Sequence, residues 1–132
     1  MIVCETNQKK LIGGYTPLNF KGGEMDSYAE DPSQETFIFS LTNNDKFRMK
    51  TTGNAIYRVS GQERICFGGC EFEICNHADK VNRCRSYSLN YYFQNDKYES
   101  NKRESFERFN GNQNEYFTVK EWEAWKITFD DE

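Results

Sequence analysis

The cysteines and the single histidine are the first candidates for chemistry in this chain of 132 residues. Four of the five cysteines and that histidine fall close together, at Cys66, Cys70, Cys75, Cys84 and His77. Zinc is commonly held by four such ligands, often in closely spaced Cys pairs. No C-x2-C pair occurs here, so the sequence favours reduced thiols packed as small apolar side chains over a metal site. We therefore assign no metal and no cofactor.

Cys84 has a second possible role because it lies between Arg83 and Arg85. Neighbouring cations lower the pKa of a thiol and increase the fraction of reactive thiolate. A thiol-based antioxidant or redox enzyme using Cys84 or its neighbouring cysteines therefore stays open as an alternative.

Two glutamate pairs have the i, i+2 spacing that places both carboxylates on one face of a strand: Glu71 with Glu73, and Glu121 with Glu123. Glycosidases use paired carboxylates, but such pairs are also ordinary on solvent-facing strands. His77 is the only histidine that could act as a base, and no G-x-S-x-G nucleophile motif is present. The sequence assigns no catalytic residue and favours a protein that is not an enzyme.

Three glycine pairs recur along the chain, at Gly13-Gly14, Gly22-Gly23 and Gly68-Gly69. None belongs to a phosphate-binding G-x-x-x-x-G-K-[ST] or G-x-G-x-x-G motif. The pairs are better interpreted as bends or as places where a backbone approaches closely within strands.

Charge and apolar patterning limit the partners and the compartment. The net charge is −4, and the cations of 46–50 and 102–103 are sparse, so a nucleic-acid-binding regulator is a weaker alternative. No apolar run approaches the roughly 20 residues of a membrane helix, and no signal peptide is evident. We expect a cytoplasmic protein, with a nuclear location as the alternative.

Short strands separated by turn residues dominate the expected secondary structure, which predicts a mainly β domain, either a sandwich or a barrel. The expected strands are Met1–Glu5, Lys10–Gly14, Thr36–Thr42, Lys46–Lys50, Ala55–Val59, Arg64–Phe67, Glu71–Cys75 and Ser86–Phe93. We expect a long loop over 94–114, and a final strand over 115–129 with a β-bulge at Lys120-Glu121 where the apolar parity changes. A short helix is the alternative for this last piece. Ten aromatic residues are expected on inner faces: Phe37, Phe39, Phe47, Phe67, Phe72, Tyr87, Tyr91, Phe117, Trp122 and Trp125.

Five segments, taken in order, resemble the TLDc domain family. They are Ile12-Gly13-Gly14-Tyr15-Thr16-Pro17-Leu18, Phe37-Ile38-Phe39-Ser40-Leu41-Thr42, Phe67-Gly68-Gly69-Cys70-Glu71-Phe72-Glu73-Ile74, Arg85-Ser86-Tyr87-Ser88 and 117–125. The signature positions carried over are Gly13, Gly14, Phe39, Ser40, Phe67, Gly68, Gly69, Glu71, Ser88 and Glu123. Because Met1 falls almost on the first hairpin, without the N-terminal portion usual in the family, we expect either a short member or a fragment, with one domain over 1–129 and an acidic tail over 130–132.

This resemblance implies a two-sheet antiparallel β-sandwich with few short helices, an α+β variant of a mainly β fold. It also implies oxidation resistance and, in several relatives, binding to the vacuolar-type proton pump (V-ATPase). The family offers no catalytic residues to carry over. We therefore expect a protein–protein interaction module of the stress response, in which most signature positions maintain the fold and Glu123 is the first to test for function.

Overall fold

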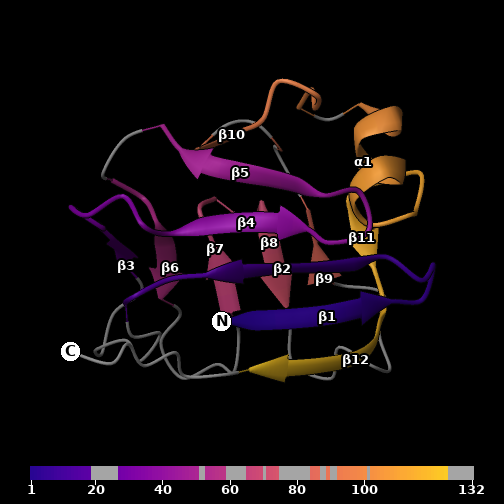
Figure 1. Cartoon of the computed structure of the whole chain (residues 1–132), viewed down its shortest axis with the longest axis horizontal. Coiled ribbons are helices and arrows are strands. Elements are labelled where there is room, and N and C mark those ends of the chain that lie inside the picture. The colour runs from indigo at the N-terminus through magenta and orange to yellow at the C-terminus, as the bar shows by residue number, and fades with distance from the viewer. Residues whose placement is uncertain are drawn as a thin grey trace.

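The computed structural model describes residues 1–18, 27–50, 53–58, 65–69, 71–74, 84–86, 89, 92–100 and 102–124. This part of the chain forms two antiparallel sheets that face each other, a front and a back sheet in the view of Figure 1. The front sheet has the order β10 (Phe93–Gln94), β5 (Asp45–Met49), β4 (Phe37–Ser40), β2 (Leu11–Tyr15), β1 (Ile2–Thr6) and β12 (Val119–Ala124). The back sheet has the order β11 (Tyr116–Phe117), β9 (Cys84–Arg85), β8 (Phe72–Ile74), β7 (Ile65–Phe67), β6 (Ile56–Arg58) and β3 (Ser27–Ala29). The predicted two-sheet β-sandwich is thereby confirmed.

The two hairpins expected near the N-terminus are present as β1–β2 and β4–β5. In the second hairpin the turn is formed by polar residues, and Asn44 adopts a left-handed φ of 56°, which Asn tolerates better than most residues. The amide of Asn43 donates a hydrogen bond to Oγ of Ser40 at 3.1 Å. Turn chemistry in the sequence therefore sets the register of this hairpin.

Aromatic rings fill much of the space between the sheets. The fully buried rings are Phe47, Phe67, Phe72, Phe93, Phe109, Phe117 and Tyr98. Phe67 stacks with Phe72 at a ring-centroid distance of 5.8 Å, and Phe47 meets Phe109 edge-on at 5.6 Å. Such pairs contribute about 0.5–1.5 kcal/mol beyond the area they bury, which offsets the small aliphatic content of the chain.

Three rings expected inside lie elsewhere. Ile38 takes the inner position on β4 and is fully buried, which turns Phe37 and Phe39 to the outer face because side chains alternate along a strand. Trp122 lies on the edge strand β12 and is 48% exposed. The sequence does not reveal the orientation of Phe37 and Phe39, because apolar residues stand on both faces of β4. Tyr87, Tyr91 and Trp125 lie outside the described residues.

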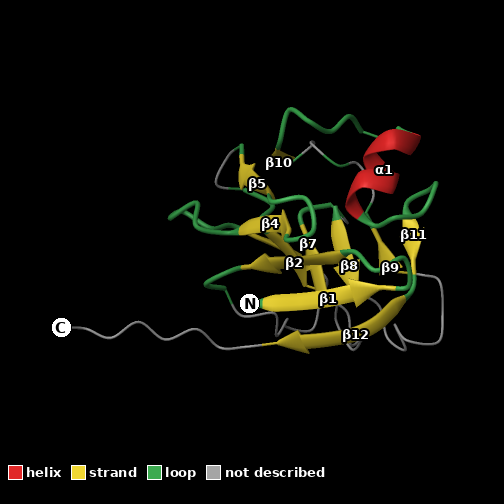
Figure 2. Ribbon diagram, turned by 45° about the vertical axis from the view of Figure 1, so that its right-hand side comes forward, coloured by secondary structure: helices red, strands yellow, loops and turns green. Residues whose placement is uncertain are grey.

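The loop expected over 94–114 is wrong in its second half, where α1 (Arg103–Phe109) forms. This helix lies across one end of the sandwich (Figure 2), and it buries Phe106 and Phe109. No side chain caps its N-terminus at Lys102. Within the described residues no helix is long and apolar enough to cross a membrane.

Two expected strands also differ from the structure. Of the strand expected over 86–93, Phe93 starts β10 in the front sheet, whereas the other described residues, Ser86, Leu89 and Tyr92, are not in strands; β9 of the back sheet ends at Arg85. The final segment crosses from the back sheet to the front sheet at Thr118, between β11 and β12. The expected bulge is confirmed at Lys120, where the pairing with β1 shifts from Glu5↔Glu121 to Thr6↔Val119.

Candidate functional site

The outer face of the front sheet, which points away from the back sheet, carries charged and apolar residues, several of them exposed. Its members follow from the strand pairing and from alternation along each strand. They are Val3, Glu5, Leu11, Gly13, Tyr15, Phe37, Phe39, Leu41, Lys46, Arg48, Glu121 and Glu123. We call this set the outer face.

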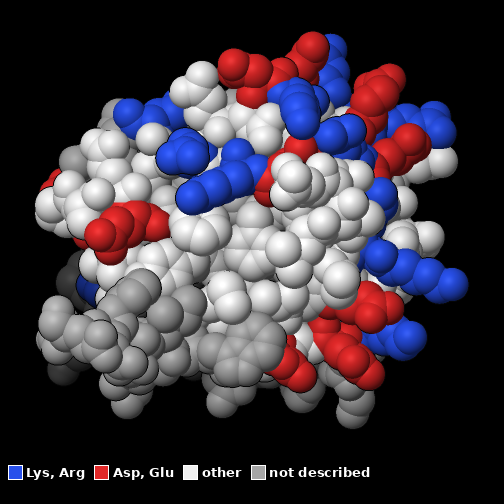
Figure 3. All heavy atoms as spheres, in the orientation of Figure 1, with Lys and Arg blue, Asp and Glu red and all other residues white. Residues whose placement is uncertain are grey.

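Charge is separated across the outer face. Lys46 and Arg48 form a basic rim on β5, whereas Glu121 and Glu123 form an acidic rim on β12, at the other side of the sheet. Between these rims lies an apolar belt on β1, β2 and β4, visible as the white band in Figure 3 with blue atoms above it and red atoms below. In this belt Leu41 is 56% exposed.

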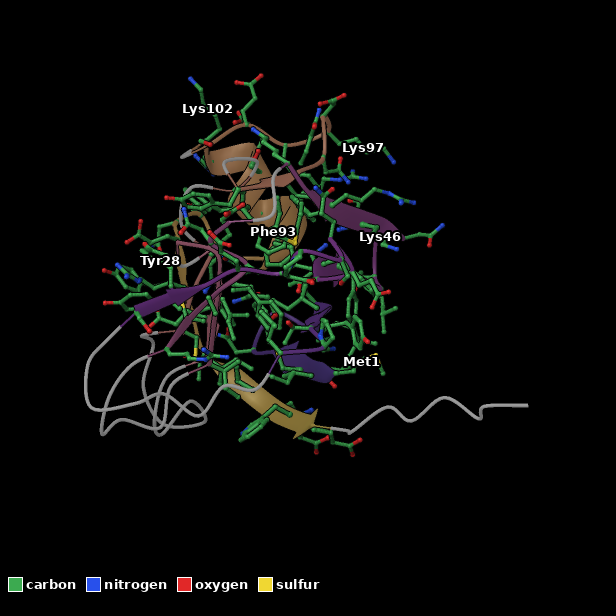
Figure 4. The ribbon with its side chains drawn as sticks, turned by 90° about the vertical axis from the view of Figure 1, so that its left-hand side faces the viewer. Met1, Tyr28, Lys46, Phe93, Lys97 and Lys102 are labelled. Carbon is green, nitrogen blue, oxygen red and sulfur yellow. The ribbon has the colours of Figure 1, made fainter. Side chains whose placement is uncertain are left out.

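The basic rim borders a groove of about 660 Å³. Its lining residues are Tyr15, Gln34, Glu35, Thr36, Phe37, Lys46, Arg48 and Met49. Nζ of Lys46 lies 4.1 Å from the centroid of the Phe37 ring, a cation–π contact, and Phe37 lies 5.5 Å from Tyr15. Figure 4 shows Lys46 extending from the front sheet toward solvent, on the side opposite to Tyr28. The groove thus combines aromatic walls with two cations and one carboxylate.

The acidic rim borders a smaller depression of about 180 Å³. It is lined by Val3, Cys4, Glu5, Leu11, Glu121, Trp122 and Glu123. Glu5 makes a long ion pair of 3.8 Å with Lys120. Among the described residues no ion pair involves Glu121 or Glu123, and both are exposed. Glu123 is therefore a surface carboxylate at the rim of the outer face.

The signature glycines of β2 each lie beneath an aromatic ring. A β-carbon at Gly13 would lie 2.6 Å from Cζ of Phe39, its cross-strand partner, and would also clash with the carbonyl oxygen of Ile2. At Gly14 a β-carbon would lie 2.6 Å from Cζ of Phe67, which reaches over from the back sheet. Both glycines therefore allow close packing, Gly13 on the outer face of the front sheet and Gly14 on its inner face.

A second group of signature residues surrounds the β7–β8 turn. Gly68 has a φ of +61°, a conformation that favours glycine. The buried carboxylate of Glu71 accepts hydrogen bonds from the amides of Tyr92 and Phe93, both at 2.9 Å. A β-carbon at Gly69 would lie 2.7 Å from the ring of Tyr92. This turn is thereby tied to the segment that leads into β10.

The two predicted glutamate pairs differ in their surroundings. Glu73 is 2% exposed and pairs with Arg85, Nε to Oε2, at 3.3 Å. Glu71 and Glu73 thus both make buried interactions within the domain. Glu121 and Glu123, in contrast, face solvent on the front sheet. Glu123 and the Gly68-Gly69 turn thus belong to different sheets and share neither of the two pockets described above.

The thiols within the described residues, those of Cys4, Cys66 and Cys84, are all buried. Burial, together with the neighbouring thiol of Cys84, raises the pKa of Cys4. Arg85, expected to activate Cys84, instead contacts Glu73, and Cys84 is 0% exposed. Cys70, Cys75, His77 and Arg83 lie outside the described residues, and the part that is described holds no cluster of three potential metal ligands.

A buried polar cluster that the sequence analysis missed joins the β4–β5 hairpin to α1. The Asp45 carboxylate accepts hydrogen bonds from the Tyr98 hydroxyl at 2.6 Å and from Arg108 Nε at 2.8 Å, and Lys97 Nζ lies at 3.3 Å. Burial alone would raise the pKa of Asp45, but these hydrogen bonds and the Arg108 charge bring it below its usual value. Asp45 and Arg108 are far apart from each other in the sequence, so no local motif predicts the cluster.

Of the remaining signature positions, Ser40 accepts the hydrogen bond from the Asn43 amide in the β4–β5 turn, and Ser88 lies outside the described residues. The sequence model of the TLDc domain matches residues 1–128. The chain belongs to the TLDc domain family. No curated protein and no solved structure matches it. In this TLDc domain the signature glycines and Glu71 hold the two sheets and their turns together, and the outer face presents exposed charges of both signs.

Proposed function

We propose that this TLDc domain is an interaction module of the oxidative-stress response that docks on the vacuolar-type proton pump. Membership of the family is the observation that carries the proposal. The resemblance associates this family with oxidation resistance and, in several members, with the pump.

The distribution of side chains supports a binding role. Gly13, Gly14, Gly68 and Glu71 are used for close packing and for backbone hydrogen bonds within the domain. The exposed rims and belt of the outer face supply apolar contact and opposite charges, which are the elements from which protein interfaces are made. Of the signature positions, Glu123 is the one whose carboxylate stands on this face.

Capture with the immobilised chain tests the proposal against purified pump, with and without ATP. We expect pump subunits to be retained by the wild type and by Glu104→Lys, a matched charge reversal at an exposed position on α1. Glu123→Lys should reduce retention, since it reverses a charge on the outer face. If the wild-type chain retains no pump subunit in either nucleotide condition, the proposal is wrong. Retention that Glu123→Lys leaves unchanged would keep the partner but remove Glu123 from the contact.

The alternatives have weaker support. Burial of Cys84 separates the thiol from solvent oxidants, which disfavours the thiol-based antioxidant or redox enzyme. No observation on the outer face supports a nucleic-acid-binding regulator. The basic rim of this face consists of Lys46 and Arg48 alone, and an acidic rim lies on the same face.

A further inference from the structure

The outer face carries opposite charges at its two sides, so it can pair with the same face of a second copy. One row of laterally paired residues crosses five strands in the order Glu123, Val3, Gly13, Phe39 and Lys46. Read from either end, it runs from charge through an apolar residue to the central glycine, then to an apolar residue and the opposite charge. Such a row can pair with a copy of itself, provided that the copy is turned so that its two ends are exchanged.

We propose that two copies of this chain associate through their outer faces, about a two-fold axis that runs parallel to the strands and over Gly13. This axis places Lys46 of each copy opposite Glu123 of the other, and Phe39 opposite Val3. Gly13 then faces Gly13. The contact is isologous, so the same charge pairing occurs twice and the association stops at a dimer.

Charge decides this orientation. A two-fold axis across the strands would bring Lys46 onto Lys46 and Glu123 onto Glu123, and like charges in an interface are unfavourable. Among the described residues Arg48, Glu121, Glu123 and Lys46 make no ion pair, and Nζ of Lys46 lies over the Phe37 ring. These charges are therefore available to a second copy.

The surface relief agrees with the same arrangement. The depression of about 180 Å³ at the acidic rim is lined by the apolar Val3 and Leu11 and by three glutamates. A lysine stem with a charged end suits this lining, because such side chains bury their methylene groups while the ammonium contacts carboxylates. The larger groove at the basic rim, of about 660 Å³, presents Lys46 to Glu123 of the other copy, and Arg48 adds positive charge in the neighbouring row of Phe37 and Tyr15.

The middle of the outer face is flat enough for two sheets to approach. Gly13 has no side chain, and the Phe39 ring lies over it rather than standing away from the sheet, so that Phe39 is only 7% exposed. Face-to-face sheets pack about 10 Å apart. The belt of Leu11, Tyr15, Phe37 and Leu41 adds apolar area around this centre.

The size of the face sets the expected strength. Five strands about 4.8 Å apart and about five residues long measure about 19 by 17 Å. This is small beside the roughly 800 Å² per partner of a standard interface. We therefore expect a weak, salt-sensitive dimer with a dissociation constant in the micromolar range or above, not an obligate one.

Charge-reversed variants test the proposal in sedimentation velocity from micromolar to about millimolar concentrations. We expect the wild type to dimerise reversibly, and to do so less as salt is raised. Lys46→Glu with Arg48→Glu makes both rims acidic, and Glu121→Lys with Glu123→Lys makes both rims basic. Each double variant alone should be monomeric, and an equal mixture of the two should restore a dimer. All four positions are exposed, so unfolding midpoints in urea should stay near that of the wild type.

The restored mixture separates this dimer from a simple loss of folding, because neither variant could regain a partner if it were unfolded. Leu41→Ser provides a second route, as it should weaken the dimer without altering charge. A wild type that stays monomeric throughout the concentration range overturns the proposal. So do double variants that dimerise like the wild type, or a mixture that stays monomeric. None of these readouts involves the proton pump, so failure here leaves the docking proposal standing.

Discussion

The ring of Phe67 in the back sheet lies directly over Gly14 in the front sheet, and a β-carbon at Gly14 would come within 2.6 Å of its Cζ atom. Contacts this short do not occur for real side chains, so the glycine determines how closely β2 and β7 approach. Phe67 in turn stacks on Phe72 at 5.8 Å. The spacing of the two sheets and the packing of the aromatic core are therefore linked through one missing side chain.

Gly14→Ala should destabilise the domain by about 1–3 kcal/mol, since the added methyl group overpacks a buried ring that has no room to move. Urea unfolding followed by far-UV circular dichroism measures the effect. Gly53→Ala is the matched control, because a β-carbon there meets nothing within 4 Å, and it should change stability by less than about 1 kcal/mol. Phe67→Leu should recover part of the loss when it is combined with Gly14→Ala. Equal stability of the two alanine variants would contradict this account of the sheet contact.

The Asp45 cluster predicts a second large effect. Asp45→Asn removes the charge that Arg108 and Tyr98 hold, and charged hydrogen bonds of this kind contribute about 1.5–3 kcal/mol. Because the Arg108 side chain is 38% exposed, we expect a loss of unfolding free energy near the lower end of that range. Glu107→Gln breaks the exposed Arg103–Glu107 pair on the same helix and should cost only about 0.3–0.5 kcal/mol. The two variants compared by urea unfolding at pH 7 decide the point, and a loss for Asp45→Asn no larger than for Glu107→Gln would show that the cluster is dispensable.

The same cluster predicts an acid-sensitive stability. Burial would raise the pKa values of Asp31 and Asp45, but hydrogen bonds from Ser33 and Thr36 to Asp31, and from Arg108, Tyr98 and Lys97 to Asp45, bring both below the usual value. A carboxyl whose pKa is lowered by folding stabilises the fold above its unfolded pKa of about 3.9, and this stabilisation is lost as the pH falls through its folded pKa.

Unfolding free energies measured from pH 7 down to pH values below about 4 should therefore decline steeply for the wild type. Asp45→Asn should decline less, so its difference from the wild type should shrink as the pH falls. A difference that stays constant over this range would show that the Asp45 carboxylate does not carry the pH dependence.

Local patterns in the sequence were enough to predict the hairpins. Alternation around Phe47 and the Asn-rich turn predicted the β4–β5 hairpin, and the parity change near Lys120 predicted the bulge that the structure confirms. The orientation of β4 could not be predicted in the same way. Ile38 and Phe39 are both apolar neighbours, and only the pairing of Ile38 with Phe47 on the core side decides which of them faces inward.

The helix and the polar cluster escaped prediction for different reasons. α1 has seven residues, no capping side chain at Lys102 and Asn-rich flanks, so its local signals are weak and its stability depends on burying Phe106 and Phe109 against the sandwich. Asp45 and Arg108 are 63 residues apart, so their contact exists only once the helix has docked. For the outer face, the sequence shows Lys46 and Arg48 only as sparse cations, because nothing in it places β12 and its glutamates in the same sheet.

Cys84 provides the last test, because the sequence and the structure favour different behaviour. Between Arg83 and Arg85 the thiol is expected to be reactive, yet it is 0% exposed and Arg85 is engaged with Glu73. Oxidation of a thiol requires contact with the oxidant, so Cys84 should react only when the domain opens. Peroxide consumption by the native protein should therefore be the same for the wild type and for Cys84→Ser. Alkylation of Cys84, followed by mass spectrometry, should accelerate in urea in step with unfolding. Slower peroxide consumption by Cys84→Ser at equal stability would overturn the burial argument and make the thiol-based function the better assignment.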